Sequence, residues 1–255
     1  MPPLSPAPSG RRVLVTGAAG GIGRAIVEAL AACDCQVAAC DVTSDVEGVA
    51  GASASAVFDV RDRAATEAGV ASAVEQLGGC DAVVANAGVV DTIHRAERFP
   101  EAEWRKDIET NLSGQFHVAQ AAFEYLRSAG DGRIVLISSV AAEMGIPGQV
   151  AYGASKAGTV GLARTLAGEW APHGIRTNVV MPGFIDTPKV KALPSPLRDA
   201  LTATIPLGRT GQVEELAGAV TFLLSPAAAY VNGVVLRVDG GAGLNTGGLM
   251  TGPKT

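Results

Sequence analysis

Two side chains with complementary acid–base chemistry stand four positions apart in the segment YGASK, residues 152–156. If this segment is helical, the phenol of Tyr152 and the ammonium of Lys156 leave the same face, with Cβ atoms roughly 5–6 Å apart. A phenol has an ordinary pKa of about 10, which is too high for an efficient base near neutrality. A nearby positive charge favours the phenolate and lowers that pKa. The spacing is also common among surface neighbours, so the prediction of a general acid/base depends on what else points there.

A glycine-rich segment, TGAAGGIG at residues 16–23, follows one apolar run and opens a helical pattern. Its glycines allow a tight turn and a close approach of the backbone to a pyrophosphate. The helix that begins there offers free N–H donors to the anion. Because of this position between strand and helix, the segment predicts a dinucleotide-binding turn made by Gly17, Gly21, Ile22 and Gly23.

Asp41 ends the second apolar run, 24 positions after Gly17. A carboxylate there can accept hydrogen bonds from both hydroxyls of an adenosine ribose, and it repels a 2′-phosphate. Gly20 precedes Gly21, so that position offers no basic side chain, and Arg24 lies in the expected helix beyond the turn. We therefore expect NAD as cofactor, with NADP disfavoured and Arg24 as the counter-signal. An ordinary strand-end residue is the simpler alternative for Asp41.

Short apolar runs alternate with longer helical patterns along the chain. Near-continuous apolar strands between helices are typical of a parallel sheet that is covered on both faces. The sequence therefore predicts an α/β protein with one doubly wound Rossmann domain and a seven-stranded, mostly parallel sheet. The expected strands cover residues 12–17, 36–41, 54–60, 81–88, 132–139, 175–183 and 233–241. The expected helices cover residues 22–32, 62–77, 101–128, 149–171 and 212–224.

The domain boundaries follow from composition. Residues 1–10 contain prolines and serines where a signal peptide needs an apolar core, so we expect a disordered tail and a cytoplasmic protein. Residues 11–243 form the expected domain, and residues 244–255 a second tail. The segment 184–210 is the least regular part of the domain and contains several prolines, which is typical of a lid over a site.

Composition excludes several partners. The net charge is −5, which does not suggest a nucleic acid or an anionic membrane surface. We find no apolar run of about 18 residues that would predict a membrane span. The three histidines show no metal-ligand spacing, and we expect no metal. The cysteines have neither CxxC nor zinc spacing and are expected to be reduced: Cys33, Cys35, Cys40 and Cys80.

The order and spacing of these motifs resemble the classical short-chain dehydrogenase/reductase family over nearly the whole chain. The resemblance also rests on DV at 59–60, NAG at 86–88, SS at 138–139 and PGFIDT at 182–187. It implies that Asp59 contacts the adenine amino group and Val60 flanks the ring. It implies that Thr187 holds the nicotinamide carboxamide. The remaining implied cofactor contacts are Asn86, Ala87, Gly88, Pro182, Gly183 and Ile185. The first helix departs from the family pattern, because it ends in ACDCQ and not in a glycine cap.

The resemblance also implies a catalytic set of Asn111, Ser139, Tyr152 and Lys156. Ser139 would hydrogen-bond the substrate oxygen, and Lys156 would bind the nicotinamide ribose as well as tune Tyr152. Asn111 would hold a water that links Lys156 to solvent. Ser138 is one residue short of Ser139 and should point to the other side of its strand.

These features predict an NAD(H)-dependent oxidoreductase acting on a small secondary alcohol or ketone. A 3-oxoacyl-[acyl-carrier-protein] reductase remains the alternative, although Asp41 and the few cations in residues 126–132 and 171–174 disfavour it. A non-catalytic nucleotide sensor is a third class, but a sensor needs no proton donor such as Tyr152. The family implies a homotetramer, which the two alanine-rich helices and the apolar last strand would suit.

Overall fold

A computed structural model of the protein describes residue 5 and residues 7–91 and 93–244. Seven strands of that part of the chain form one sheet in the order β3-β2-β1-β4-β5-β6-β7. Each pairing between neighbouring strands is parallel, so the predicted doubly wound sheet is confirmed. The strands are β1 (Arg12–Thr16), β2 (Gln36–Asp41), β3 (Ala54–Val57), β4 (Ala82–Ala85), β5 (Gly132–Ile137), β6 (Ile175–Pro182) and β7 (Val235–Val238).

The helices include every helix that the sequence predicted, with small shifts of their ends. They are α1 (Gly21–Ala31), α2 (Arg63–Leu77), α3 (Glu101–Ile108), α4 (Gly114–Ala129), α5 (Ala141–Met144), α6 (Val150–Trp170), α7 (Pro188–Lys191), α8 (Ser195–Ala203) and α9 (Val213–Leu224). Short helical turns are η1 (Ser44–Gly48), η2 (Ala96–Arg98), η3 (Glu109–Ser113), η4 (Ala171–His173) and η5 (Pro226–Ala228).

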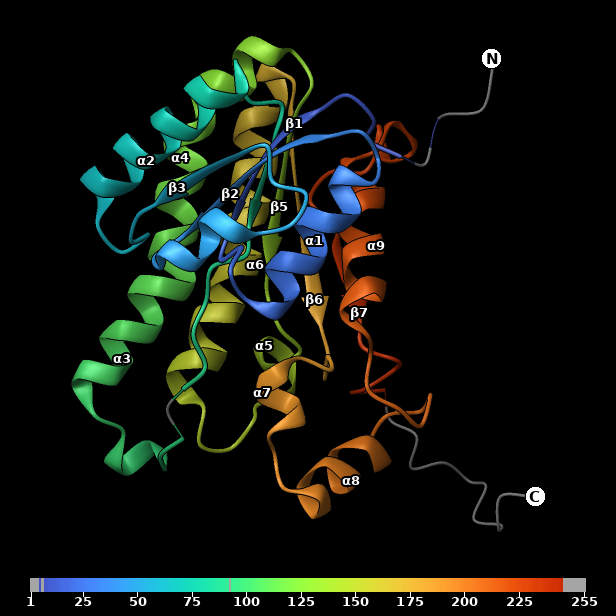
Figure 1. Ribbon diagram of the computed structural model, residues 1–255. Coiled ribbons are helices and arrows are strands. Elements are labelled where there is room, and N and C mark those ends of the chain that lie inside the picture. Colours follow the sequence, from blue (N-terminus) through green and yellow to red (C-terminus); the bar gives the residue numbers. More distant parts are fainter. Residues whose placement is uncertain (1–4, 6, 92, 245–255) are drawn as a thin grey trace.

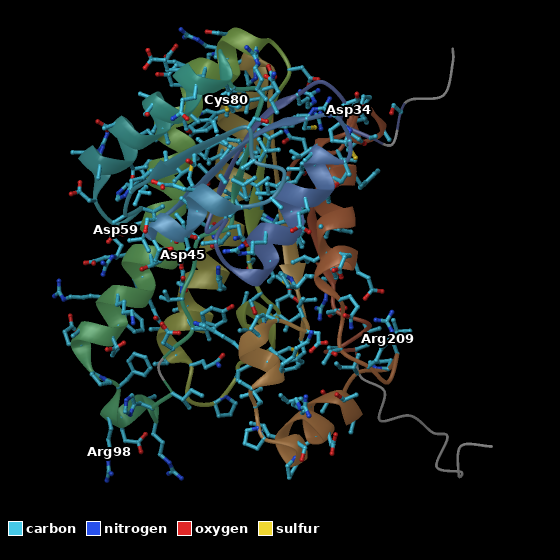
Figure 2. The ribbon with its side chains drawn as sticks, in the orientation of Figure 1. Asp34, Asp45, Asp59, Cys80, Arg98 and Arg209 are labelled. Atoms are coloured by element: carbon cyan, nitrogen blue, oxygen red, sulfur yellow. The ribbon has the colours of Figure 1, made fainter. Side chains whose placement is uncertain are left out.

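Helices cover both faces of the sheet and create two hydrophobic cores (Figure 1). Helices α1 and α9 pack on one face, while α2, α4 and α6 pack on the other. Successive strand residues alternate between the cores, as Leu14 does with its neighbours Val13 and Val15. The loops at the carboxyl ends of the strands, which carry Arg98 and Arg209, lie opposite the end that carries Asp34 and Cys80 (Figure 2). This carboxyl edge is where doubly wound folds place their ligands.

The structure corrects the sequence prediction in three places. The expected helix 101–128 is divided, because η3 is a π-helical turn between α3 and α4. The expected irregular segment 184–210 contains two short helices, α7 and α8, each with a proline in its first turn. The strands expected at 54–60, 81–88 and 233–241 are shorter, at four residues each. Hydrophobic periodicity does not register one extra residue in a helical turn, which is why the π-turn escaped it.

The first helix ends without a glycine because Asp34 takes over the left-handed position, with φ of 59°. The Cys35 N–H donates to the Leu30 carbonyl, and the Asp34 N–H donates to the Ala31 carbonyl. This is the bonding pattern of a helix end that normally uses glycine, and aspartate is one of the few other residues that tolerate it.

The inner part of the predicted tail contacts the domain. Pro8 is buried, and its carbonyl accepts a hydrogen bond from the Cys35 thiol. The Ala227 N–H donates to the carbonyl of Ser5. The disorder predicted for residues 1–10 therefore does not extend to this inner part. Residues 1–4, 6 and 245–255 lie outside the described residues.

A charged cluster fixes the amino edge of the sheet. Asp131 pairs with Arg11 at 2.5 Å, with Arg133 at 2.6 Å and with Arg176 at 3.5 Å. Arg133 is 3 % exposed and also donates to the carbonyl of Leu224 at the end of α9. Burial raises the pKa of Asp131, but hydrogen bonds from Arg133 and Arg11 outweigh it and leave that pKa below its usual value. Asp131 therefore compensates the positive charge of the buried Arg133 guanidinium.

We expect Asp131→Asn to lower the free energy of unfolding at pH 7 by about 1–3 kcal/mol, because Arg133 would stay buried with its charge uncompensated. This loss is smaller than the one expected for a fully buried ion pair, because the Asp131 side chain is half exposed. The pKa of Asp131 is lowered on folding, so its contribution is present at pH 7 and disappears as pH falls through that pKa. Urea unfolding should therefore show a difference that shrinks toward pH 3. The control Glu67→Gln breaks an exposed pair on α2 and should change stability by less than about 0.5 kcal/mol.

Candidate active site

The glycine-rich turn joins β1 to α1 and lies against the loop after β4. Gly17 has φ of 65°, and a Cβ there would come within 2.8 Å of the Ala87 backbone. A Cβ on Gly23 would come within 2.1 Å of the Gly17 carbonyl oxygen. The Asn86 side-chain amide donates to the carbonyls of Thr16 and Gly17, at 3.0 and 3.1 Å. The turn can therefore close only with glycine at these positions, and Asn86 fixes its shape.

Helix α1 begins at Gly21, so its first N–H groups, including that of Ile22, lie at the carboxyl edge of the sheet. The first turn of α1 carries no acidic residue that would oppose an anion. A Cβ on Gly21 would come within 3.1 Å of Pro188 at the start of α7. The bare backbone of this turn therefore fits a pyrophosphate between the turn and the segment that follows β6.

Asp41 and Arg24 meet on the same residue of the turn. The Asp41 carboxylate accepts hydrogen bonds from the Ala19 N–H at 2.9 Å and the Val42 N–H at 2.8 Å. The Nε of Arg24 donates to the Ala19 carbonyl at 2.8 Å. Arg24 lies in α1 beyond the turn, as expected, but its side chain folds back along the helix to reach the turn. A negative and a positive group are thus both positioned beside the place where an adenosine ribose would lie.

The expected adenine contacts follow β3. Asp59 accepts hydrogen bonds from the side chain of Arg61, the shortest at 2.6 Å. These hydrogen bonds from Arg61 lower the pKa of Asp59. Val60 is buried, and a Cβ on Gly114 would come within 2.6 Å of its side chain. Val60 is therefore firmly packed, whereas Asp59 would have to share its oxygens between Arg61 and an adenine amino group.

The expected catalytic side chains come together from β5 and α6. The Lys156 Nζ lies 5.7 Å from the centroid of the Tyr152 ring and donates to the Ile137 carbonyl at 2.9 Å. Ser139 follows β5, and its hydroxyl is hydrogen-bonded with Tyr152. The Ser138 hydroxyl donates to the backbone carbonyl of Lys156 at 2.8 Å, which confirms that it points to the other side of the strand.

The acid–base properties of the pair differ from the expectation. Burial raises the pKa of Tyr152, and the hydrogen bond with Ser139 lowers it only in part. The expected lowering by Lys156 is therefore not found, because its ammonium is bonded to the Ile137 carbonyl and not directed at the phenol. Burial also lowers the pKa of Lys156 to about 8. The Lys156 ammonium therefore begins to lose its proton only slightly above neutral pH, where it would have to act as a cation.

Asn111 lies in the π-turn η3 and is fully buried. Its side-chain oxygen accepts from the Val89 N–H at 2.7 Å, and its amide donates to the Val89 carbonyl at 2.9 Å. A Cβ on Gly88 would come within 3.0 Å of the Asn111 side-chain oxygen and 3.3 Å of the Lys156 Nζ. The Asn111 side chain thus holds the loop after β4, and Gly88 keeps the space between Asn111 and Lys156 open.

The last expected contacts follow β6. Pro182 ends that strand, and a Cβ on Gly183 would come within 2.7 Å of Asp239. Ile185 is buried, and Thr187 caps α7 by accepting a hydrogen bond from the Val190 N–H at 3.4 Å. This segment therefore leaves the sheet in a fixed direction and brings Thr187 to the cleft edge.

Two buried polar side chains near the site were not predicted. Gln115 donates to the same Ile137 carbonyl as Lys156, at 2.9 Å, and Asp107 lies on α3. Both are 1 % exposed. The burial of these two side chains could not be predicted, because both belong to a stretch rich in polar residues that is typical of an exposed helix. A hollow of about 480 Å³ lies beside the site, between α5, the loop after it and the start of α6.

Comparison with known proteins supports an enzyme. A family profile described as Enoyl-(Acyl carrier protein) reductase matches residues 17–243. The chain is 39% identical to a 3-oxoacyl-[acyl-carrier-protein] reductase of Thermotoga maritima, over 91% of this chain and 97% of that protein. It is 38% identical to a cis-4-hydroxycyclohexanecarboxylate dehydrogenase of Sinomonas cyclohexanicum, over 91% and 96%. The crystal structure of a levodione reductase superposes with a TM-score of 0.86 at 34% identity, over 91% of this chain and 97% of that one.

The fold and these relatives define an oxidoreductase that uses a nicotinamide coenzyme and acts on CH–OH or keto groups. The chain belongs to the classical short-chain dehydrogenase/reductase family. Among the described residues, no helix is long and apolar enough to cross a membrane. Within the same residues, no group of three or more His, Cys, Asp or Glu side chains could hold a metal ion.

We expect Lys156→Met to raise the free energy of unfolding at pH 7 by about 1–3 kcal/mol while it impairs the site. Folding lowers the pKa of Lys156 from 10.5 to about 8, and at about 1.4 kcal/mol for each pH unit this gives an upper limit of about 3.5 kcal/mol. The lost hydrogen bond to Ile137 reduces the gain. Below pH 8 the lysine is charged in both states and this cost is complete. Between pH 8 and 10.5 the unfolded chain binds more protons, so the cost of the wild type, and with it the difference, should decline.

Urea unfolding at pH 7 and at pH 10 measures this difference. The control Lys106→Met removes a half-exposed lysine on α3 and should give no stabilisation. A Lys156→Met protein that is less stable than the wild type at pH 7 would contradict the argument.

Proposed function

We propose that the protein transfers a hydride between NAD(H) and a small secondary alcohol or ketone, with Tyr152 as the general acid/base. The observation that carries the proposal is the cluster of the partly exposed Ser139 and Tyr152 with the buried Lys156. The cofactor would supply or accept the hydride at its nicotinamide ring. The residues proposed to hold it are Gly17, Gly21, Ile22, Gly23, Asp41, Asp59, Val60, Asn86, Ala87, Gly88, Tyr152, Lys156, Pro182, Gly183, Ile185 and Thr187.

Each proposed catalytic group has a distinct role at the substrate oxygen. Ser139 donates a hydrogen bond that orients this oxygen, and Tyr152 gives it a proton in ketone reduction or takes one in alcohol oxidation. The Lys156 ammonium stabilises the phenolate that forms and binds the nicotinamide ribose. Asn111 would support proton exchange with solvent through its backbone, because its side chain is used to hold Val89.

We expect Tyr152→Phe to lower turnover by about 10²–10⁴-fold, because the ring and its packing remain but the proton donor is lost. Coenzyme affinity should change by less than about twofold, since the phenol serves the substrate oxygen. Steady-state assays with a panel of secondary alcohols and ketones, together with coenzyme titration by fluorescence, measure both quantities. Tyr125→Phe is the matched control, because Tyr125 is an exposed tyrosine of α4. A loss of turnover below about tenfold in Tyr152→Phe would exclude the assigned role.

We propose NAD over NADP because the Asp41 carboxylate is fixed at the turn by Ala19 and Val42, where it would repel a 2′-phosphate. We expect NADH to bind at least about tenfold more tightly than NADPH, since opposing like charges cost several kcal/mol. Asp41→Asn should remove most of that preference, and a further Arg24→Ala should then weaken NADPH specifically. The control Glu28→Gln removes an exposed charge elsewhere on α1 and should change nothing. Equal or tighter binding of NADPH to the wild type would reverse the assignment.

The alternative is reduction of a 3-oxoacyl group carried by an acyl-carrier protein. Two relatives named 3-oxoacyl-[acyl-carrier-protein] reductase favour it. They are 39% and 40% identical to this chain, and the alignments cover 97% of each. The enoyl reduction in the family description would need more residues between the tyrosine and lysine than the YGASK segment has. Comparing turnover of a 3-oxoacyl thioester with that of simple ketones, with both coenzymes, would separate the two proposals.

We propose that residues 184–210 form a lid on the domain of residues 11–243. Lys189 of α7 pairs with Asp91 in the loop after β4 at 2.5 Å, and Pro188 lies against Gly21 of the turn. These contacts span the two sides of the proposed cofactor cleft. Hydrogen exchange with and without NAD would test the lid, which predicts greater protection of these residues in the complex.

We also propose a cytoplasmic homotetramer. The four cysteines are free, which suits a reducing compartment. The exposed face of α6 carries small residues that allow close helix packing: Ala154, Ala157, Gly161 and Gly168. The edge beside β7 exposes Phe222, Tyr230 and Val234, which would suit a second interface. Light scattering at micromolar concentration tests the assembly, and cell fractionation the location.

A further inference from the structure

Asp107 is a buried carboxylic acid that the proposed chemistry does not use. It lies on α3, four positions before Asn111, and is 1 % exposed. Its Oδ1 has no hydrogen-bond partner among the described residues. Unpaired buried carboxylates are costly, so such a group in a folded protein needs a specific explanation.

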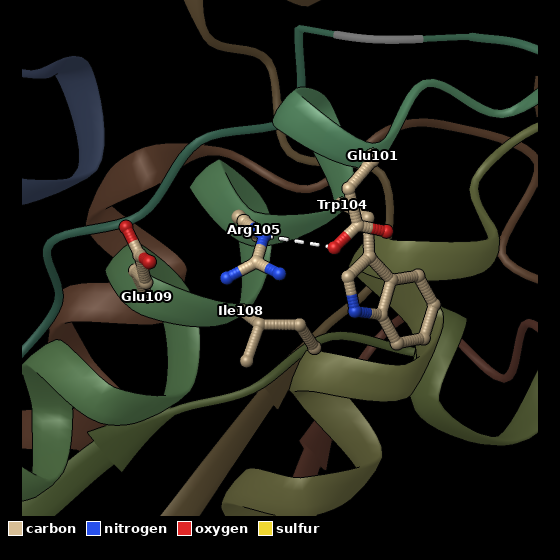
Figure 3. A pocket seen from close by; sticks show the side chains of 5 residues that line it. All are labelled: Glu101, Trp104, Arg105, Ile108 and Glu109. Carbon is tan, nitrogen blue, oxygen red and sulfur yellow. Dashed lines mark hydrogen bonds and ion pairs between the residues drawn. The ribbon is translucent and has the colours of Figure 1, made fainter.

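The other charges of this helix segment are on its outer side. Figure 3 shows Glu101, Arg105 and Glu109 around a surface hollow with Trp104, and the dashed line marks the ion pair of Glu101 with Arg105. These side chains reach water and can be replaced at little cost. Asp107 lies on the inner side of the same helix, which packs against α6.

The charged and titratable groups that act on Asp107 come from three elements. Lys106 and Glu103 are its neighbours on α3, and Asp91 belongs to the loop after β4. Lys106 is directed to the surface, where it lies 3.5 Å from Asp91 and 3.9 Å from Glu103. The remaining cation is Lys156 of α6, which is 3 % exposed. The buried carboxyl and the buried ammonium therefore belong to two helices that pack against each other, and each charge acts on the other across the contact between α3 and α6.

Among the residues that the structure describes, Asp107 is the one anion that acts on the charge of Lys156. Within the described part of the chain its ammonium makes no ion pair and donates only to the Ile137 carbonyl. Burial lowers the pKa of Lys156 to about 8, and the negative charge of Asp107 acts in the opposite direction. The same charge raises the pKa of Tyr152. Asp107 thus favours the protonated form of both groups of the YGASK pair.

We propose that Asp107 is a positioning residue of this site, a buried counter-charge that keeps the ammonium of Lys156 protonated beside Tyr152. This inference rests on the proposed function for the role of Lys156, but the interaction of the two charges does not depend on the substrate. Asp107 favours the cationic form of Lys156 from a distance. Because the two make no direct ion pair, the N–H groups of the ammonium stay available to the nicotinamide ribose. Asp107 acts on the site through Lys156.

The direct test is the titration of Lys156 in protein labelled with 13C at the lysine Cε, followed by NMR between pH 6 and 11. Loss of one signal in Lys156→Met assigns the resonance. In Asp107→Asn the midpoint of Lys156 should fall by about one pH unit, the lower end of what a nearby opposite charge contributes. Asp107→Leu removes the charge with an apolar side chain and should give the same shift. It serves as the second variant if Asp107→Asn fails to fold.

The matched control is Glu109→Gln, which removes a carboxylate two positions away on the exposed side of the helix and should leave the midpoint unchanged. Turnover gives a second readout. The alkaline limb of the pH profile should move to lower pH in Asp107→Asn, because the lysine charge is lost earlier. A change in stability alone would not move either quantity.

The outcomes separate this inference from the proposed function. A downward shift of the Lys156 midpoint supports the counter-charge even if no secondary alcohol or ketone is turned over, in which case the proposed function fails alone. An unchanged midpoint in both Asp107 variants overturns the inference, whatever the activity. A shift of the same size in Glu109→Gln also overturns it, because the effect would then be a general one of net charge.

Discussion

The burial of the Lys156 ammonium is the constraint on which the rest of the site depends. A cation removed from water needs fixed dipoles or an opposite charge, and here several elements supply them. The end of β5 provides the Ile137 carbonyl, and the next residue, Ser138, bonds the backbone of Lys156 itself. The inner side of α3 contributes Asp107 at longer range. Only a sheet with α3 and α6 on the same face can bring these groups to one place.

The irregular features of the fold follow from this demand. Asn111 must reach the loop after β4 while α3 and α4 continue past α6, and the π-turn η3 re-aims its side chain for that purpose. Gly88 suits this place because a Cβ there would press on the Asn111 side-chain oxygen at 3.0 Å and on the Lys156 Nζ at 3.3 Å. On the other side of the cleft, the turn from β1 to α1 leaves its backbone bare for an anion. The closest backbone approaches at the site, those of Gly17, Gly23 and Gly88, thus lie at the carboxyl edge, where a polar ligand has to enter.

The sequence predicted the regular parts of the structure well because apolar periodicity and turn residues are local signals. The seven strands and their parallel pairing are in this class, whereas the meeting of Ser139 with Tyr152 and Lys156 was implied by the family resemblance. Features that depend on packing between distant elements could not be predicted. The π-turn, the fold-back of Arg24 onto Ala19 and the burial of Asp107 have no signature in composition or spacing. The direction of the Tyr152 pKa was also missed, because spacing along a helix says nothing about how deeply the phenol is buried.

The turn at Ala19 shows why the sequence pattern predicts a nicotinamide coenzyme more firmly than it predicts the choice between NAD and NADP. The N–H of Ala19 holds a carboxylate, and its carbonyl holds a guanidinium, so opposite charges are tethered to one peptide unit each. The Asp41 oxygens are anchored by backbone donors on both sides, which keeps the negative charge in place. Arg24 is held by its Nε, which leaves the two outer nitrogens of the guanidinium on a flexible stem. A fixed charge repels a 2′-phosphate at once, whereas a mobile one must first lose side-chain entropy to attract it. This difference in anchoring is the physical basis of the proposed preference for NAD, and that preference should weaken if the carboxylate lost either anchor.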